Sequence, residues 1–154
     1  MRIDHFADHP QWMETVAHWH QAAFGHFDPS KTLQDRLRAL SAMKRDALPM
    51  GLVAHSGDGV PLGCASVVRS TFTHNELGPW LSAVYVAPEH RSRGIASDLA
   101  ERAAAECARL GLAELFLFTP HSERLYARLG WETFDRTQIG KADAAVMRRR
   151  VQWR

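Results

Sequence analysis

The sequence predicts a mixed α/β fold, in which a central β-sheet of about six or seven strands is flanked by about four helices. Apolar residues recur at helical spacing in two early segments and over residues 95–110, whereas residues 80–87 and 113–119 are apolar runs of strand length. This strand–helix–strand order predicts one parallel crossover, which is right-handed in nearly all proteins. A chain of 154 residues suits a single domain with one core, and we expect that domain to span residues 1–154.

The first fifty residues predict one short strand, at residues 2–6, and two helices. The helix over residues 10–24 follows from apolar side chains at Trp12, Val16, Trp19 and Ala23. Ser30 or Thr32 can cap the second helix, and Pro49 ends it. Its apolar stripe consists of Leu33, Leu37, Leu40, Met43 and Ala47.

The period of the pattern then changes from helix to strand. Residues 50–56 and 61–70 predict a hairpin around the Gly-Asp-Gly turn at 57–59. Residues 73–79 are expected to form a loop. The apolar, β-branched and aromatic run at 80–88 predicts a buried central strand, which Pro88 stops because proline cannot donate to a sheet ladder.

The helix expected at residues 95–110 ends at Gly111, a typical C-cap. Its outward face carries Glu101 and Glu106, and Asp98 and Arg102 have the spacing of an i,i+4 ion pair. Its inward face consists of Ile95, Leu99, Ala103, Cys107 and Leu110.

Four elements complete the chain in the prediction. A strand is expected at 112–120 and a short helix at 121–130, which ends at Gly130. The last two strands, at 131–136 and 144–153, are expected to be antiparallel neighbours. Pairing of the final strand between two copies would give a homodimer.

The composition excludes several classes of protein. The net charge of +2 gives no electrostatic case for a nucleic-acid partner, and the C-terminal arginines alternate with apolar residues as on a solvated strand edge. No apolar run approaches the ~18 residues of a membrane span. The N-terminus lacks the apolar core of a signal peptide, and neither cysteine lies in a CxxC pair. We therefore expect a cytoplasmic protein with reduced cysteines.

Residues 88–97 predict an anion site where a helix follows an apolar strand. The first helical turn leaves backbone N–H groups without partners, and the helix dipole adds positive charge there. Gly94 and Ala96 leave room for a phosphate to reach these groups, and Arg91 and Arg93 add charge. The loop matches neither the GxxxxGK[ST] pattern of a P-loop nor the three glycines of a dinucleotide-binding fingerprint.

The stretch VYVAPEHRSRGIASDL resembles the signature of the GNAT superfamily of acetyl-CoA-dependent N-acetyltransferases. The family pattern [QR]-x-x-G-x-[GA] is met by Arg91, Gly94 and Ala96. The later stretch LYARLGWE is similar to a second family motif, with Tyr126 four residues before Gly130-Trp131. The order of elements also agrees, so that the resemblance covers about residues 2–150 and is strongest over 80–134.

The resemblance implies a fold, a co-substrate and its site. The two strands of the crossover would splay apart, and the pantetheine arm of acetyl-CoA would lie between them. Its polar groups would bond to the backbone of Val84, Tyr85 and Val86, one of whose N–H groups would polarise the thioester carbonyl. The pyrophosphate would lie on the amides of Ser92, Arg93, Gly94, Ile95, Ala96 and Ser97.

Transfer to an amine also needs an acid and a base. In the resembling family, the tyrosine corresponding to Tyr126 protonates the leaving thiolate. Some members carry a glutamate base on the strand where this chain has Leu117 and Phe118, which cannot serve. Glu76, just before the central strand, is the better candidate, and His74 and His121 remain alternatives.

The acceptor is expected to be a primary amine. By the topology of the family, Phe24, Phe27, Trp80 and Glu76 would form an aromatic, mildly acidic pocket for it. No sequence feature identifies the amine, which leaves polyamines, antibiotics, amino acids and protein amines open. A non-catalytic acyl-CoA sensor and a transferase of longer acyl groups are the alternative functions. The nine histidines show no metal-binding motif, so that no metal is expected.

Overall fold

A computed structural model describes residues 1–152 of the chain, and it contains one seven-stranded mixed sheet. The strands are β1 (Arg2–His5), β2 (Met50–His55), β3 (Pro61–Val68), β4 (Trp80–Val86), β5 (Glu114–Thr119), β6 (Glu132–Ile139) and β7 (Ala142–Arg150). Their order across the sheet is β1-β2-β3-β4-β5-β7-β6. Among the strand pairs of residues 1–152, only β4 and β5 are parallel, as the predicted crossover requires.

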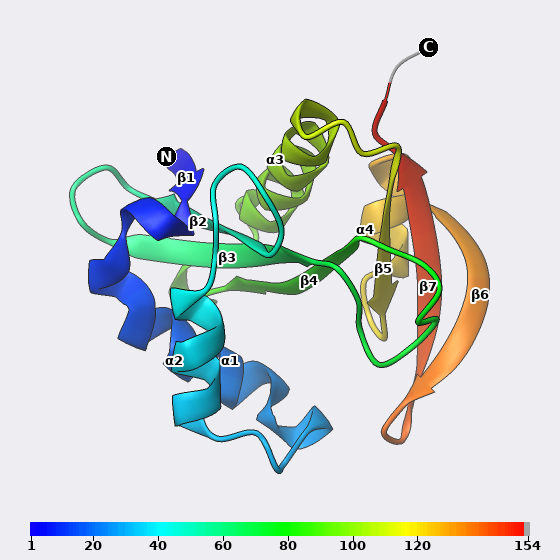
Figure 1. The fold of residues 1–154 in the computed structure, drawn as a ribbon, viewed down its shortest axis with the longest axis horizontal. Helices are drawn as coiled ribbons and strands as arrows, with labels where there is room; N and C mark the ends of the chain where they lie inside the picture. Colours follow the sequence, from blue (N-terminus) through cyan, green and yellow to red (C-terminus); the bar gives the residue numbers. More distant parts are fainter. Residues whose placement is uncertain (153–154) are drawn as a thin grey trace.

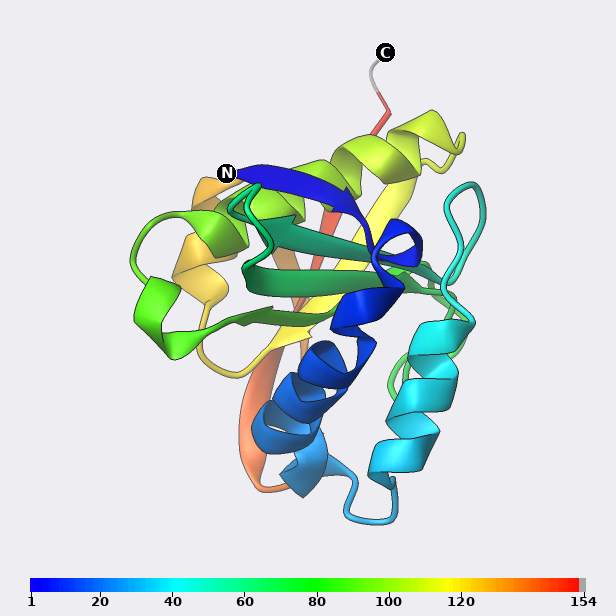
Figure 2. The ribbon, with the colours of Figure 1, turned by 90° about the vertical axis from the view of Figure 1, so that its left-hand side faces the viewer.

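The helices are α1 (Met13–Phe24), α2 (Leu33–Ser41), α3 (Ile95–Arg109) and α4 (Glu123–Arg128). One core cluster joins α3 and α4 to the sheet, and a second joins α1 and α2 to the opposite face of the sheet (Figures 1 and 2). Two of the most buried side chains in these clusters are Leu99 of α3 and Val16 of α1. The predicted mixed α/β sheet with about four helices is therefore confirmed.

The second predicted helix is too long, because α2 ends at Ser41 instead of reaching Pro49. Its start is as expected, since Thr32 and Asp35 form a reciprocal capping box. Beyond Ser41 the chain turns back, and the Lys44 N–H donates to the Pro49 carbonyl over 2.8 Å. This local bond replaces the next helical turn, while Met43 still packs against the α1–α2 core.

Two predictions for the outward face of α3 are wrong. Glu106 is buried, and its carboxylate lies 2.6 Å from Nε2 of His5 on β1 and 3.1 Å from Arg109. Arg102 does not pair with Asp98. Instead its guanidinium donates to the Ile3 carbonyl over 2.8 Å and lies 3.6 Å from Glu106. The edge strand β1 turns this part of the helix into an interface, which helical periodicity alone does not indicate.

The final strand lies inside the sheet, contrary to the prediction that it could pair with a second copy. β7 is antiparallel to both β5 and β6, so that the edges of the sheet are β1 and β6. The antiparallel pairing of the last two strands is confirmed, and Trp153 lies outside the described residues. Within residues 1–152, no helix has the length and apolar character needed to span a membrane.

Candidate functional site

Strands β4 and β5 separate after their first residues and leave a wedge in the middle of the sheet. Their parallel ladder contains the single pair Trp80–Phe116, whereas β5 and β7 are paired over six positions. On the other side of β4, the Ala87 N–H donates to the Leu62 carbonyl of β3. Because neighbouring residues of a strand point their backbone groups to opposite sides, those of Val86 point into the wedge. The predicted splaying of the crossover strands is thus present.

A β-bulge in β4 reverses the side-chain alternation at the wedge. The register passes from Ser66–Ser82 to Cys64–Tyr85, so that β4 has one residue more than β3 over this interval. Ala83 takes the extra position, with φ +54°, a left-handed conformation that is uncommon for a residue with a side chain. As a result, Tyr85 packs on the α1 side and Val84 on the α3 side.

The start of α3 faces the wedge with free backbone donors. Gly94 is the N-cap residue with φ +78°, and no side chain caps the helix. Ser92 is also left-handed, with φ +65°. Alternation of left-handed residues before a helix makes backbone N–H groups converge on one point, which suits an anion. A Cβ at position 94 would meet no protein atom within 4 Å, so that space is open there.

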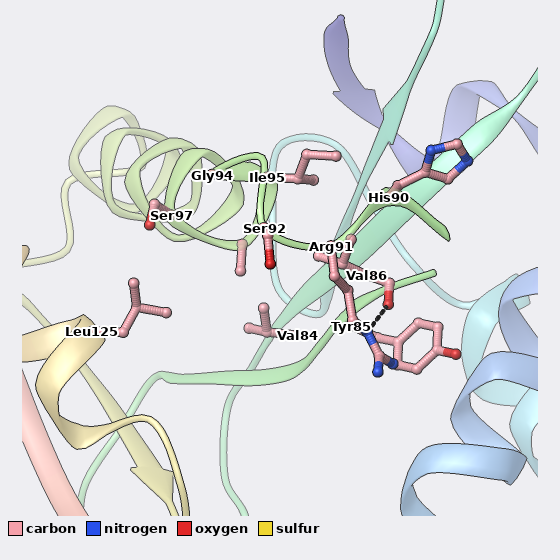
Figure 3. A pocket seen from close by; sticks show the side chains of 11 residues that line it. Val84, Tyr85, Val86, His90, Arg91, Ser92, Gly94, Ile95, Ser97 and Leu125 are labelled. Atoms are coloured by element: carbon pink, nitrogen blue, oxygen red, sulfur yellow. Dashed lines mark hydrogen bonds between the residues drawn. The ribbon is translucent and has the colours of Figure 1, made fainter. Parts of the chain in front are cut away.

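A cavity of about 380 Å³ lies between this helix start and the wedge. Figure 3 shows three of its lining residues, with Ser97 of α3 above Leu125 of α4 and Val84 of β4 to the right of Leu125. Every predicted cofactor-binding residue except Arg93 lines the cavity, together with two residues that sequence reasoning missed. The full lining is Val84, Tyr85, Val86, His90, Arg91, Ser92, Gly94, Ile95, Ala96, Ser97 and Leu125.

The two missed residues are neighbours of residues that the motifs did identify. His90 directly precedes Arg91, and its Nδ1 is buried with no hydrogen-bond partner among the described residues. Leu125 directly precedes Tyr126. Position next to a motif was the only signal in the sequence, because neither residue type is unusual in a loop or a short helix.

The Arg91 side chain does not point toward the helix start. Its Nε donates to the Val86 carbonyl over 2.9 Å, and its guanidinium carbon lies 5.5 Å from the centre of the Tyr85 ring (Figure 3). The Tyr85 ring in turn lies 5.4 Å from that of Trp19 on α1. Arg91 therefore occupies a backbone group of the wedge and contacts the opposite face of the sheet.

Tyr126 lies in α4 directly after Leu125, but it is not among the residues that line the cavity. It is 6% exposed and packs edge-on against Trp131 at 5.9 Å, within the core cluster that Val84 also joins. Burial raises the pKa of Tyr126 to about 12. The phenol therefore stays protonated at neutral pH and has a proton to donate.

The opposite face of the sheet carries the predicted acceptor residues on separate elements. Phe24 belongs to α1 and Phe27 to the 3₁₀ turn Gly25–Phe27, while Trp80 is fully buried beneath the loop 69–79. Glu76 is exposed in that loop, and His121 is exposed in the turn before α4. None of these residues lines the cavity at the start of α3, so their grouping into an acceptor pocket stays a prediction.

His74 fixes the loop 69–79 to β6. Its Nε2 lies 2.7 Å from an Asp135 oxygen, and its Nδ1 lies 2.7 Å from the Thr73 hydroxyl. The hydrogen bond from His74, followed by that from the Arg136 N–H, holds the pKa of Asp135 below its ordinary value. Both ring nitrogens of His74 are therefore engaged in contacts that hold the loop.

Asp4, His9 and His55 form a cluster with the donor atoms of a metal site. Nε2 of His9 and of His55 lie 2.9 and 2.7 Å from the same Asp4 oxygen. However, the Gly57 N–H donates to Nδ1 of His55. That bond places the remaining proton of a neutral ring on Nε2, so that no lone pair faces Asp4. The cluster is a hydrogen-bond network that joins β1 to β2.

Comparison with known proteins identifies the family of the chain. The model of the acetyltransferase (GNAT) family matches residues 13–131. No curated protein matches the chain in sequence.

Several solved structures have a similar fold. An aminoglycoside 6'-N-acetyltransferase complexed with coenzyme A superposes with a TM-score of 0.79 at 12% identity, covering 100% of this chain and 99% of that one. The structure of yncA from Salmonella typhimurium with its cofactor acetyl-CoA gives 0.73 at 20%, covering 97% and 94%. A spermidine N-acetyltransferase chimera from Vibrio cholerae and hSSAT gives 0.74 at 15%, covering 98% and 96%. At these identities, the likeness concerns the fold.

Proposed function

The chain belongs to the acetyltransferase (GNAT) family and is an acyltransferase, and we propose that it transfers the acetyl group of acetyl-CoA to a primary amine. One observation carries the proposal: the wedge between β4 and β5 opens directly onto the uncapped start of α3, with a cavity between them. A ligand with an anionic diphosphate and a narrow amide-bearing arm suits this combination. The relatives of this fold that were crystallised with coenzyme A or acetyl-CoA support the same ligand.

The chain offers a separate set of groups to each part of this ligand. The N–H groups at residues 92–97 are proposed to bind the diphosphate, since Gly94 leaves the approach open and the helix dipole favours negative charge. The backbone of Val84, Tyr85 and Val86 is proposed to bind the pantetheine arm. Arg93 is exposed beside the loop and adds charge at its rim.

The reaction forms a C–N bond and breaks the C–S bond of the thioester. A backbone N–H of β4 at the bulge polarises the carbonyl, so that charge developing on its oxygen is stabilised. The amine attacks through its lone pair, and the C–S bond breaks when the tetrahedral intermediate collapses. Tyr126 is proposed to donate its proton to the departing sulfur and to recover a proton from the attacking nitrogen, which must lose one more to become an amide. Its place in α4 directly after Leu125, which lines the cavity, supports this role.

Glu76 remains the proposed group that takes the amine proton. An ammonium with a pKa near ~10.4 must lose a proton before it can attack. Glu76 is exposed on the acceptor side, so we propose that it acts through water and attracts a cationic amine. The bonded nitrogens of His74 make that residue the weaker candidate.

The direct test is thiol release from acetyl-CoA in the presence of a panel of primary amines, including spermidine and an aminoglycoside. Turnover with one of them supports the proposal. Tight binding of CoA without turnover on any amine would instead favour an acyl-CoA sensor. Faster release from a longer acyl-CoA would identify a different donor, and failure to bind CoA at all would refute the proposed donor site.

We also propose a cytoplasmic location. Cys64 and Cys107 are free and buried, and burial raises the pKa of each thiol to about 12. Two unpaired cysteines suit a reducing compartment.

A further inference from the structure

In the free protein, the Arg91 side chain is already bound to a backbone carbonyl of the wedge between β4 and β5. The Val86 carbonyl points between β4 and β5, where the ladder leaves it without a strand partner, and Nε of Arg91 donates to it over 2.9 Å. An amide N–H of a pantetheine arm would need this same acceptor. The arginine of the phosphate loop and the arm of the proposed ligand therefore compete for one carbonyl.

We propose that Arg91 occupies the Val86 carbonyl in the free protein and is displaced from it when the donor binds. This inference rests on the proposed acetyl-CoA site. In the free protein, Arg91 satisfies a backbone carbonyl that the separated strands would otherwise leave unpaired. In the complex, the pantetheine amide takes over the carbonyl, and the guanidinium moves to the diphosphate at the helix start.

The present contacts of Arg91 are weak enough to be exchanged. The side chain is exposed, so that water competes for its hydrogen bond and screens its contact with Tyr85. A diphosphate offers two charged acceptors to the planar guanidinium, which a single neutral carbonyl cannot. Arg91 and the helix start belong to one short loop, so the move needs a change of side-chain rotamer and no unfolding.

The displacement of Arg91 would also change side-chain contacts on the α1 side of the sheet. Arg91 stacks on Tyr85, and Tyr85 contacts Trp19 of α1, with ring centres 5.4 Å apart. Removal of the guanidinium exposes one side of the Tyr85 ring and changes the surroundings of the Trp19 indole. Donor binding is thereby coupled to the helix that, with α2, covers the acceptor face.

The test compares two ligands by calorimetry with the full chain and with Arg91→Ala. Pantetheine has the arm but lacks the diphosphate, whereas CoA has both. Because the variant removes the competitor and also a phosphate ligand, we expect it to bind pantetheine about threefold more tightly and CoA about tenfold more weakly. Arg93→Ala is the matched control: it should weaken CoA binding and leave pantetheine binding unchanged, since Arg93 does not line the cavity.

The affinity for pantetheine should rise and that for CoA should fall. These opposite changes distinguish displacement of Arg91 from a fixed structural role. If Arg91→Ala weakens or does not change pantetheine binding, the displacement is refuted while the donor site stands. If the unaltered protein binds neither CoA nor pantetheine, the proposed function itself fails. A second readout is the Trp19 fluorescence, obtained as the difference from Trp19→Phe. It should respond to pantetheine in the parent protein and lose that response in Arg91→Ala, and a retained response would contradict the coupling.

Discussion

The two faces of β4 present different kinds of groups to a ligand. On the α3 side, the cavity offers mainly backbone groups: the N–H groups that begin α3 and the carbonyl of Val86. On the α1 side, the proposed acceptor residues are side chains from α1, from the turn after it and from the loop 69–79, such as Phe24, Phe27 and Glu76. Backbone recognition depends on how the chain bends, whereas side-chain recognition depends on residues that can be exchanged without altering the fold. The proposed donor face therefore depends on the path of the backbone, and the proposed acceptor face depends on side chains.

Replacement of Tyr126 by phenylalanine is the strongest test of the chemistry on the donor face. Loss of the acid should lower kcat by about 100-fold, as is typical for general acid catalysis. The affinity for CoA should stay nearly constant, because the ring and its packing against Trp131 remain. Steady-state kinetics with the best amine, together with calorimetry of CoA binding, measures both. An unchanged kcat would remove Tyr126 from the mechanism.

The same phenol predicts a pH dependence with a definite sign. The pKa of Tyr126 is raised to about 12 in the folded protein, above the value of about 10 in an unfolded chain. Its contribution to stability is therefore complete below pH ~10 and is lost as the pH rises through 12. Alkaline unfolding followed by circular dichroism should show a higher midpoint pH for Tyr126→Phe than for the parent, and equal midpoints would contradict the burial of the phenol.

Substitution of the two glycines at opposite ends of α3 can separate an effect on CoA binding from an effect on stability. Gly94 has φ +78° and Gly111 has φ +82°, and an added Cβ would meet no protein atom within 4 Å at either position. Substitution by alanine should therefore destabilise both variants by about 1–2 kcal/mol, the cost of a left-handed residue with a side chain. Only Gly94→Ala places a methyl group where the phosphate is expected, so it alone should weaken CoA binding, by about tenfold. Equal CoA affinities in the two variants would argue against a phosphate site at the start of α3.

The fold could be predicted largely because its elements follow local patterns. The crossover β4–α3–β5 combines two apolar strands with an amphipathic helix, and each has its own period. One error depends on a distant segment, and the other on a local hydrogen bond just beyond the helix. Glu106 looked like a surface residue until β1 brought His5 against it, and α2 ended early because Lys44 binds the carbonyl of Pro49. Neither contact can be read from the spacing of residues along one element.

The cavity proposed as the donor site was predictable for a related reason. A glycine at the start of a helix has a sequence signature, and all but one of the ten predicted cofactor-binding residues line the cavity. The direction of the Arg91 side chain was not predictable, because it depends on the carbonyl that the separated strands leave free. The acceptor residues come from distant elements, so no single stretch of sequence contains their arrangement.

Glu76→Gln tests whether Glu76 takes the amine proton on the proposed acceptor face. If the carboxylate takes the proton through water, the variant should lower kcat/KM for the amine by about fivefold. CoA affinity should not change, because Glu76 does not line the donor cavity. His121→Gln alters another exposed candidate and serves as the comparison. A larger effect in His121→Gln than in Glu76→Gln would transfer the role of base to the histidine.

Asp135→Asn should give the smallest effect, because it removes only the anchor of the loop. The variant keeps the shape of the side chain but loses the charge that binds His74, and a looser loop 69–79 should raise KM for the amine about two- to threefold with CoA affinity unchanged. The pKa of Asp135 is lowered in the folded protein, so the stability gained from this pair is complete above pH 3.8 and is lost as the pH falls below it.

The thermal unfolding midpoint of the parent protein should accordingly be higher than that of Asp135→Asn at pH 6. The two midpoints should become equal at pH 2.5. Asp143→Asn is the control, since Asp143 is an exposed acid on β7 whose partner, Gln138, lies in the same hairpin and outside the loop. If Asp143→Asn raises KM as much as Asp135→Asn does, the effect comes from the negative charge of the hairpin and the loop is not held by His74. If only Asp135→Asn does so, the acceptor face depends on a loop that the donor face does not need.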